Sequence, residues 1–150
     1  MVIADNNNQD VYKWLCNKLG FKVAQTVTVA VLHEDKIVSA VSYFKDGPVC
    51  LITSAAENGS WCNPETLSEL LRIPFDDLGC RVAKFETSVY NKNANRFCKG
   101  IGCVKEGLLR YAHHDGTHQV VWSLTKKELV KKKWYRHNRF NKLNRFNKGV

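Results

Sequence analysis

The sequence predicts an α+β fold in which a mixed, mostly antiparallel sheet is flanked by helices. Apolar residues repeat in the order helix, hairpin, strand, helix, strand, helix, hairpin. The central strand–helix–strand unit is typical of a parallel strand pair, and the hairpins on either side add antiparallel strands. The charge divides the chain into a neutral body, residues 1–125, and a basic tail, residues 126–150, which carries the whole net charge of +9. We therefore expect one globular domain followed by a basic extension.

The first half of the body is expected to form a helix and then three strands. In residues 9–19, Val11, Leu15 and Leu19 share a helical face, and Gly20 ends the pattern. In "QTVTVAVL", valines alternate with threonine and alanine, which indicates a half-buried strand. "IVSAVSYF" follows a turn as its antiparallel partner, and "VCLITS" is typical of a buried strand.

Asparagine and proline mark the later helices. Asn63 has the character of an N-cap and Pro64 suits the first helical position, with a kink expected at Pro74. The remaining expected elements are a strand at residues 81–89, a helix at 91–101, a hairpin at 103–124 that turns at Asp115-Gly116, and a short helix opened by the capping box of Thr125 and Glu128.

Composition narrows the class of protein. The chain has 44% hydrophobic residues, lacks an apolar run of membrane-spanning length and does not begin like a signal peptide, so we expect a cytoplasmic protein. None of the six cysteines forms a C-x-x-C pair, which favours buried thiols over disulfides. His113, His114 and His118 flank the expected turn as polar residues, and no metal site is expected.

The stretch "NKNANRFCKGIGCVKEGLLR" has the spacing Asn91-x-x-Ala94-x-x-Phe97-x-x-x-x-Gly102-x-x-x-Glu106-Gly107-x-x-Arg110. Together with the order of elements, this spacing resembles the GNAT superfamily of acetyl-CoA-dependent N-acetyltransferases, and within it the branch that acetylates the N-termini of ribosomal and other proteins. The resemblance covers residues 24–125. It implies a splayed central sheet and transfer of an acetyl group to an amine of a protein or aminoacyl acceptor by direct attack in a ternary complex. The compact size and the repetitive tail suggest a virus-encoded member, which would act in the host cytoplasm.

The resemblance also implies where acetyl-CoA binds, in the gap between two diverging strands. The implied cofactor-binding residues are Cys50, Leu51, Ile52, Thr53, Gly59, Ser60, Asn63 and Asn91. The other role predicted for Asn91, compatible with the first, is that of a helix N-cap. The phosphate-binding loop departs from the family pattern, because residues 58–64, "NGSWCNP", contain one glycine, and Glu65 in the next turn opposes an anion.

Candidate catalytic residues follow from location. Glu57, Glu86 and His114 are candidate bases for the acceptor amine. Cys98 takes the place at which many family members have a tyrosine that protonates the leaving thiolate, and its alternative role is packing on the buried helix face.

The tail ends in a tandem repeat, "NRFNKL" followed by "NRFNKG". Basic side chains interleaved with aromatic rings suit RNA, the ribosome or another polyanion that also offers flat faces. The alternatives are a solvated tail, a membrane surface and an acidic protein. The expected contact residues are Lys131, Lys132, Lys133, Trp134, Arg136, Arg139, Phe140, Arg145 and Phe146.

A second function stays open from the sequence. The chain could be a GNAT-fold binding protein without catalysis that grips nucleic acid or a protein through its tail. The loop at residues 58–64 distinguishes the two functions, because an intact phosphate cradle favours the enzyme and a gap filled by Trp61 favours the binding protein.

Overall fold

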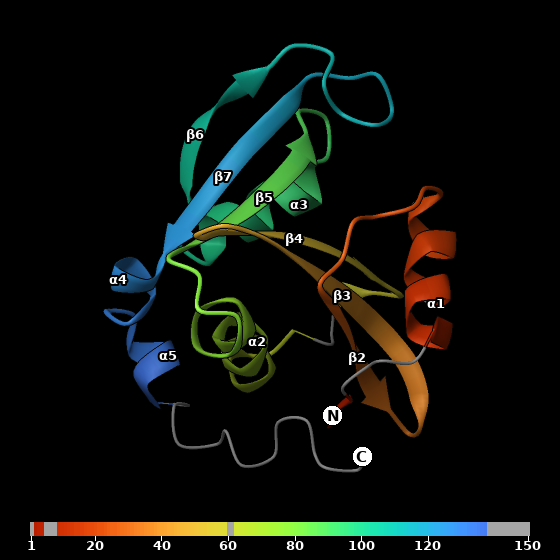
Figure 1. Ribbon diagram of the computed structural model, residues 1–150, viewed down its shortest axis with the longest axis vertical. Coiled ribbons are helices and arrows are strands. Elements are labelled where there is room, and N and C mark those ends of the chain that lie inside the picture. The colour runs from red at the N-terminus through yellow and green to blue at the C-terminus, as the bar shows by residue number, and fades with distance from the viewer. Residues whose placement is uncertain (1, 5–8, 60–61, 138–150) are drawn as a thin grey trace.

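A computed structural model describes residues 2–4, 9–59 and 62–137 of the chain. In these residues seven strands form one sheet, in the order β1-β2-β3-β4-β5-β7-β6 (Figure 1). The strands are β1 (Val2–Ala4), β2 (Val27–His33), β3 (Lys36–Asp46), β4 (Val49–Ala56), β5 (Val82–Ser88), β6 (Val104–Leu109) and β7 (Gln119–Thr125). The helices are α1 (Gln9–Leu19), α2 (Pro64–Arg72), the π-helical turn η2 (Ile73–Asp77), α3 (Lys92–Gly100), α4 (Lys126–Leu129) and α5 (Lys133–His137).

The predicted α+β class is confirmed. Every neighbouring strand pair is antiparallel except β4 and β5, which are parallel and are joined by α2 as the strand–helix–strand pattern indicated. The short strand β1, which pairs with β2, is an addition to the predicted order. None of the described helices is long and apolar enough to cross a membrane.

Two layers of helices cover the sheet, and alternate residues of each strand face them. On one side, Ala30 of β2 and Ala40 of β3 pack with Leu15 of α1. On the other side, Val29 and Val41 belong to the larger core beneath α2 and α3. Figure 1 shows the β2–β4 half of the sheet between α1 and α2.

The kink expected at Pro74 takes the form of a π-helical turn. Proline has no N–H, so the carbonyl of Leu70, four residues earlier, loses its helical donor. The buried hydroxyl of Tyr43 donates to that carbonyl at 2.7 Å. The chain then closes the wider turn with the N–H of Leu78 on the carbonyl of Ile73, at 2.9 Å.

The core extends beyond residue 125. The capping box of Thr125 and Glu128 opens α4 as predicted, and places Leu129 in the main core at 0% exposure. Tyr135 of α5 is 3% exposed in the same core, with Trp134 packed beside it. The first part of the basic tail therefore packs against the body.

Candidate active site

Strands β4 and β5 pair at their beginnings and then separate. Their register contains three pairs, Val49 with Val82, Cys50 with Ala83 and Leu51 with Lys84. Beyond them the two strands diverge (Figure 1). A parallel sheet that opens in this way leaves unpaired backbone groups on both facing edges, and buried groups of this kind require partners.

A cavity of about 770 Å³ lies at this opening. Its two walls are residues 52–59, from β4 and the loop after it, and residues 85–88 of β5. Phe97 and Cys98 of α3 line it from one layer, and Leu19 and Phe21 line it from the layer of α1. The cavity thus reaches both faces of the sheet, and its size is within the usual range for a small-molecule site.

Two of the four β4 residues in the implied cofactor edge line the cavity. Ile52 and Thr53 line the cavity, whereas Cys50 and Leu51 belong to the paired part of the strand. Cys50 is fully buried, and burial raises the pKa of its thiol to about 12. Gly59 and Asn91 also line the cavity, and Ser60 lies outside the described residues.

Asn91 caps α3 at the rim of the cavity. Its Oδ1 accepts from the N–H of Ala94 at 3.1 Å, so its predicted capping role is confirmed. Asn95, one turn later, ties the helix to the end of β5. Its Nδ2 donates to the carbonyl of Ser88 at 3.1 Å, and its Oδ1 accepts from the indole N–H of Trp122 at 3.1 Å. These bonds fix the N-terminus of α3 beside the opening between the strands.

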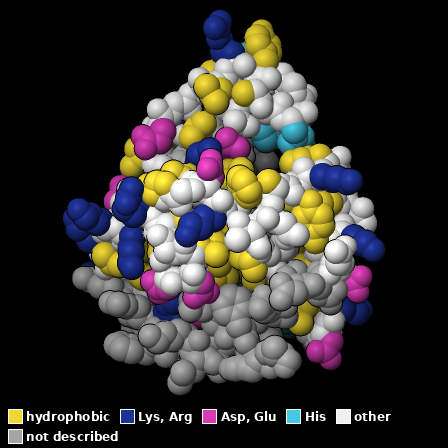
Figure 2. All heavy atoms as spheres, in the orientation of Figure 1, with side chains coloured by type: hydrophobic (Ala, Val, Ile, Leu, Met, Phe, Trp, Pro, Cys, Tyr) yellow, Lys and Arg dark blue, Asp and Glu magenta, His cyan; other side chains and the backbone are white. Residues whose placement is uncertain are grey.

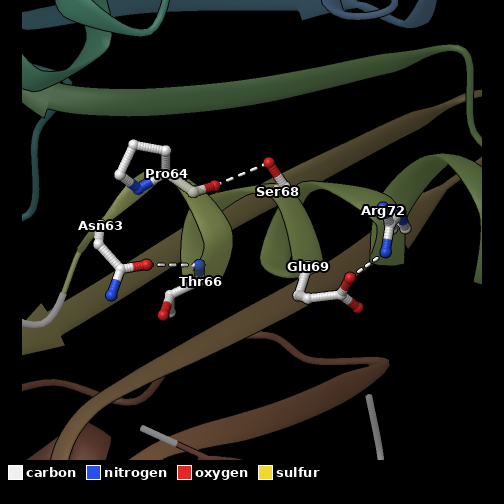
Figure 3. Close-up of polar contacts among 6 residues, drawn as sticks. All are labelled: Asn63, Pro64, Thr66, Ser68, Glu69 and Arg72. Carbon is white, nitrogen blue, oxygen red and sulfur yellow. Dashed lines mark hydrogen bonds and ion pairs between the residues drawn. The ribbon is translucent and has the colours of Figure 1, made fainter. Parts of the chain in front are cut away.

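The N-terminus of α2, the expected phosphate site, uses its own donors. Asn63 is the N-cap, as predicted, and its Oδ1 accepts from the N–H of Thr66 at 2.8 Å (Figure 3). Pro64 has no N–H to offer. Glu65 adds negative charge to the first turn. The helix end is therefore a weaker anion site than the bare N-terminus of a helix.

The end of α2 near its π-helical turn is held by a buried ion pair. Glu69 and Arg72 bond to each other within the helix, and Arg72 is 1% exposed (Figure 3). The guanidinium carbon of Arg72 lies 5.9 Å from the ring centroid of Tyr135, which joins α2 to α5.

The structure brings all four candidate catalytic residues to the cavity wall. Glu57 forms an ion pair of 2.9 Å with Lys18 of α1. The ring of His114 stacks on that of Phe21, with centroids 3.8 Å apart. Cys98 is 2% exposed and packs in the core while it contacts the cavity. Whether any of these residues takes part in catalysis stays a prediction.

The loop between β6 and β7 supplies a residue that sequence reasoning did not assign to catalysis, His113. The hydroxyl of Thr117 lies 2.7 Å from that of Ser88 on β5, and the N–H of His113 donates to the carbonyl of Thr117 at 3.1 Å. These bonds place both His113 and His114 on the cavity wall. Figure 2 shows histidine side chains beside a hollow in the upper part of the molecule.

Two further thiols, those of Cys103 and Cys62, have raised pKa values. A hydrogen bond with Cys98, followed by burial, raises the pKa of Cys103. Burial raises the pKa of Cys62 to about 11. Both thiols therefore stay protonated near neutral pH and are poor nucleophiles. Among residues 2–4, 9–59 and 62–137, no three histidine, cysteine or acidic side chains are grouped to hold a metal ion.

The expected contact residues of the tail are only partly described. Lys131 and Lys133 are exposed, Lys132 and Trp134 are half-buried, and the backbone of Arg136 lies in α5. Arg139, Phe140, Arg145 and Phe146 lie outside the described residues, as does Trp61 of the loop before α2.

Among the comparisons with known proteins, only the one with solved structures finds matches, and these concern the fold. No family model matches the sequence. A comparison with curated protein sequences also finds no match. Solved structures do match this chain, and three of them are the following acetyltransferases.

A GCN5-related N-acetyltransferase from Brucella melitensis is 18% identical with a TM-score of 0.60, and the match covers 77% of this chain and 57% of that one. The ribosomal-protein-S5-alanine acetyltransferase from Vibrio fischeri is 16% identical with a TM-score of 0.59, over 69% of this chain and 63% of that one. Mutant forms of the spermidine/spermine N-acetyltransferase SpeG from Vibrio cholerae are 14% identical with a TM-score of 0.63, over 85% of this chain and 82% of that one.

The first five matched structures belong to longer chains, of which this chain spans 57% to 65%. At these identities the likeness concerns the fold. The described chain has the fold of the GNAT acetyltransferases.

Proposed function

We propose that the protein is an acetyl-CoA-dependent N-acetyltransferase that acts on an amine of a protein or aminoacyl acceptor. The observation that carries this proposal is the divergence of β4 and β5 after Leu51 and Lys84, which opens a cavity of about 770 Å³ reaching both faces of the sheet. A donor and an acceptor that enter from opposite faces would meet in this cavity, as direct transfer in a ternary complex requires.

The unpaired edge of β4 fits the arm of acetyl-CoA. From Ile52 to Ala56 this strand keeps its bonds to β3 on one side and has no register with β5 on the other. Its outward backbone groups can bond the amides of the pantetheine arm as an added strand would. Capping uses Oδ1 of Asn91, so its Nδ2 is the donor that this side chain offers to a carbonyl oxygen.

Acetyl-CoA supplies a thioester, whose carbonyl carbon is open to attack by an uncharged amine. The protein's own part is to position that amine and to remove its proton. Burial keeps the thiol of Cys62 protonated, and Cys98 is packed in the core, so an acyl-cysteine route is disfavoured.

Calorimetry with acetyl-CoA and the full chain is the primary test. We expect saturable binding, and the variant Asn91→Ala should bind several-fold more weakly because it loses a donor worth about 1 kcal/mol. The matched control is Asn17→Ala on α1, outside this cavity, which should bind as the wild type does. Absence of binding at millimolar acetyl-CoA would overturn the proposal and leave the binding-protein alternative.

The acceptor is tested with a panel of peptides that have alanine, serine or methionine at a free N-terminus, and with an aminoacylated tRNA. Mass spectrometry should show an added acetyl group on the terminal nitrogen of at least one member. Acetylation of a free polyamine alone would contradict the proposed acceptor class while it retains the proposed reaction.

We propose further that the basic segment contacts a polyanion such as RNA. The support is the exposure of Lys131 and Lys133 beside core residues that hold α5 in place. A labelled single-stranded RNA should bind with an affinity that falls steeply with salt. The double variant Lys131→Ala and Lys133→Ala should lower the affinity and reduce the salt slope by about 2. An unchanged slope would place the contact elsewhere.

A further inference from the structure

A chain of polar contacts links strand β5 to His113 through Gln119. The Nε2 group of Gln119 donates to Oε2 of Glu86 at 3.2 Å. The Oε1 atom of Gln119 lies 3.3 Å from Nδ1 of His113. The pairing of β5 with β7 sets Glu86 opposite Val121, so Gln119, two residues away, is on the same face and within reach.

These polar contacts determine which ring nitrogen of His113 carries a hydrogen. A carboxylate only accepts hydrogen bonds, so the NH₂ group of Gln119 must face Glu86, and its carbonyl oxygen must face His113. That oxygen also only accepts, so Nδ1 of His113 must be the donor. A neutral imidazole has one N–H, so Nε2 is left with a lone pair that can accept a proton.

The backbone holds this imidazole at the cavity. His113 lines the wall that Phe21 and His114 also line. Its N–H bonds to Thr117, whose hydroxyl contacts Ser88 at the end of β5. Gln119 is only 8% exposed, so the amide that orients the ring is protected from water.

The other candidate bases are held in ion pairs, hydrogen bonds or ring contacts of their own. Glu57 is paired with Lys18 of α1. Glu86 receives the amide of Gln119 and lies 3.7 Å from the ammonium of Lys84. His114 is stacked on Phe21.

We propose that His113 is the general base of the reaction, with Gln119 and Glu86 as positioning residues that hold its ring with hydrogen on Nδ1. This proposal rests on the proposed function and adds to it the residue that activates the acceptor. An N–H bond of the acceptor ammonium breaks, an N–H bond forms at Nε2, and the proton then passes to solvent. In the transfer itself a C–N bond forms and the C–S bond breaks, and the second proton lost by nitrogen ends on the released thiol.

Charged and titratable groups lie near the ring in its own loop and on β5. Within the loop these are His114, whose ring centroid is 4.4 Å away, and Asp115. From β5 it is Glu86, which acts through Gln119. Asp115 and Glu86 are the acidic groups near the ring, and His114 is the other titratable group beside it.

Nuclear magnetic resonance of the free protein tests the tautomer without any turnover. Long-range proton–nitrogen spectra of the full, nitrogen-15-labelled chain should show His113 with hydrogen on Nδ1, assigned by the loss of its signals in His113→Gln. In Gln119→Leu the signals should shift toward hydrogen on Nε2, because the acceptor is removed. His33→Asn, a change on the remote β2–β3 turn, should leave them unaltered. Hydrogen on Nε2 of His113 in the wild type would overturn the proposal.

Kinetics then test the role. With acetyl-CoA and the peptide of the panel that reacts fastest, kcat/KM of the wild type should fall below a pH set by an imidazole. His113→Gln should lower kcat/KM by about 10²-fold to 10⁴-fold and remove this fall. His33→Asn is the matched control and should retain the wild-type profile, and acetyl-CoA affinity measured by calorimetry shows that His113→Gln is folded.

The outcomes are distinguishable. A wild-type profile in His113→Gln, or a fall that disappears in His114→Gln instead, overturns the assignment of His113 alone. Absence of acetyl transfer by the wild type overturns the proposed function and this inference together.

Discussion

Replacing Asn95 by leucine should destabilise the protein by disconnecting α3 from the sheet. The side chain of Asn95 makes four hydrogen bonds. Its Nδ2 donates to the carbonyls of Ser88, at 3.1 Å, and Val89, at 3.4 Å. Its Oδ1 accepts from the hydroxyl of Thr87, at 2.5 Å, and from the indole of Trp122, at 3.1 Å. Leucine keeps the branching at Cγ but supplies no polar atom.

The size of the effect follows from these contacts. At about 1 kcal/mol for each bond, the loss is about 4 kcal/mol. The indole of Trp122 retains the hydroxyl of Thr87 at 3.3 Å, and leucine forms helices better than asparagine by about 0.5 kcal/mol. We therefore expect the free energy of unfolding to fall by about 2–3 kcal/mol, and Tm to fall by about 4–12 °C for a chain of this length.

Urea unfolding of the full chain measures this change. Asn93→Leu is the matched control, because it makes the same substitution at an exposed position of the same helix. It should change the free energy of unfolding by no more than about 0.5 kcal/mol. If Asn95→Leu differs from this control by less than about 1 kcal/mol, the network around Asn95 does not hold α3 in place, and the reasoning is refuted.

Three further predictions concern Gly102, Glu65 and Cys50. Gly102 has φ +95°, and a Cβ added at this position would meet the end of the Lys132 side chain, so Gly102→Ala should lower the free energy of unfolding by about 1–3 kcal/mol. Gly100→Ala, at a helical position with open space around it, should raise the free energy of unfolding by about 0.5–1 kcal/mol. Equal urea midpoints for the two variants would contradict this. Glu65→Gln removes a charge that opposes phosphate, so acetyl-CoA should bind about 2–5 times more tightly by calorimetry, and weaker binding would contradict this. Burial raises the pKa of Cys50 to about 12, so the folded state keeps a proton that the unfolded state loses above about pH 9. The free energy of unfolding should therefore fall as the pH rises beyond that point, by up to about 1.4 kcal/mol per pH unit. Cys50→Ala should reduce this slope, and an unaltered slope would contradict the assignment.

Local signals in the sequence were sufficient for most elements. The alternation in residues 25–44 predicts the β2–β3 hairpin, because one face of each strand must be buried. Asn63, Asn91 and Thr125 mark helix starts because a short polar side chain can accept from a backbone N–H three residues later. These rules depend on neighbours in the chain, so they can be applied without knowledge of the fold.

The position of the opening could not be read in the same way. "VCLITS" is uniformly apolar in its first half, and nothing in it indicates that pairing with β5 stops at Leu51. The resemblance placed the cofactor edge at residues 50–53, whereas the unpaired edge begins at Ile52. Similarly, His113, Gln119 and Glu86 come together only through the register of β5 with β7 and the course of a loop, which are long-range properties.

The site is located at a boundary between two half-sheets that are each internally complete. Strand β4 is bonded to β3 along its whole length, from Val49 to Ala56, and β5 is bonded to β7 from Val82 to Ser88. The two halves meet at only three residue pairs, so each strand keeps a full partner on its far side while the facing edges separate. The edge proposed to bind acetyl-CoA belongs to the first half, whereas Asn91 and His113 are attached to the second. Their relative position therefore depends on packing beneath the boundary, where Ile52 and Phe85 share one core with Leu70. Leu70 does not line the cavity, so a substitution of Leu70 would alter the site while contacting neither substrate, because it would change the angle at which the two halves diverge.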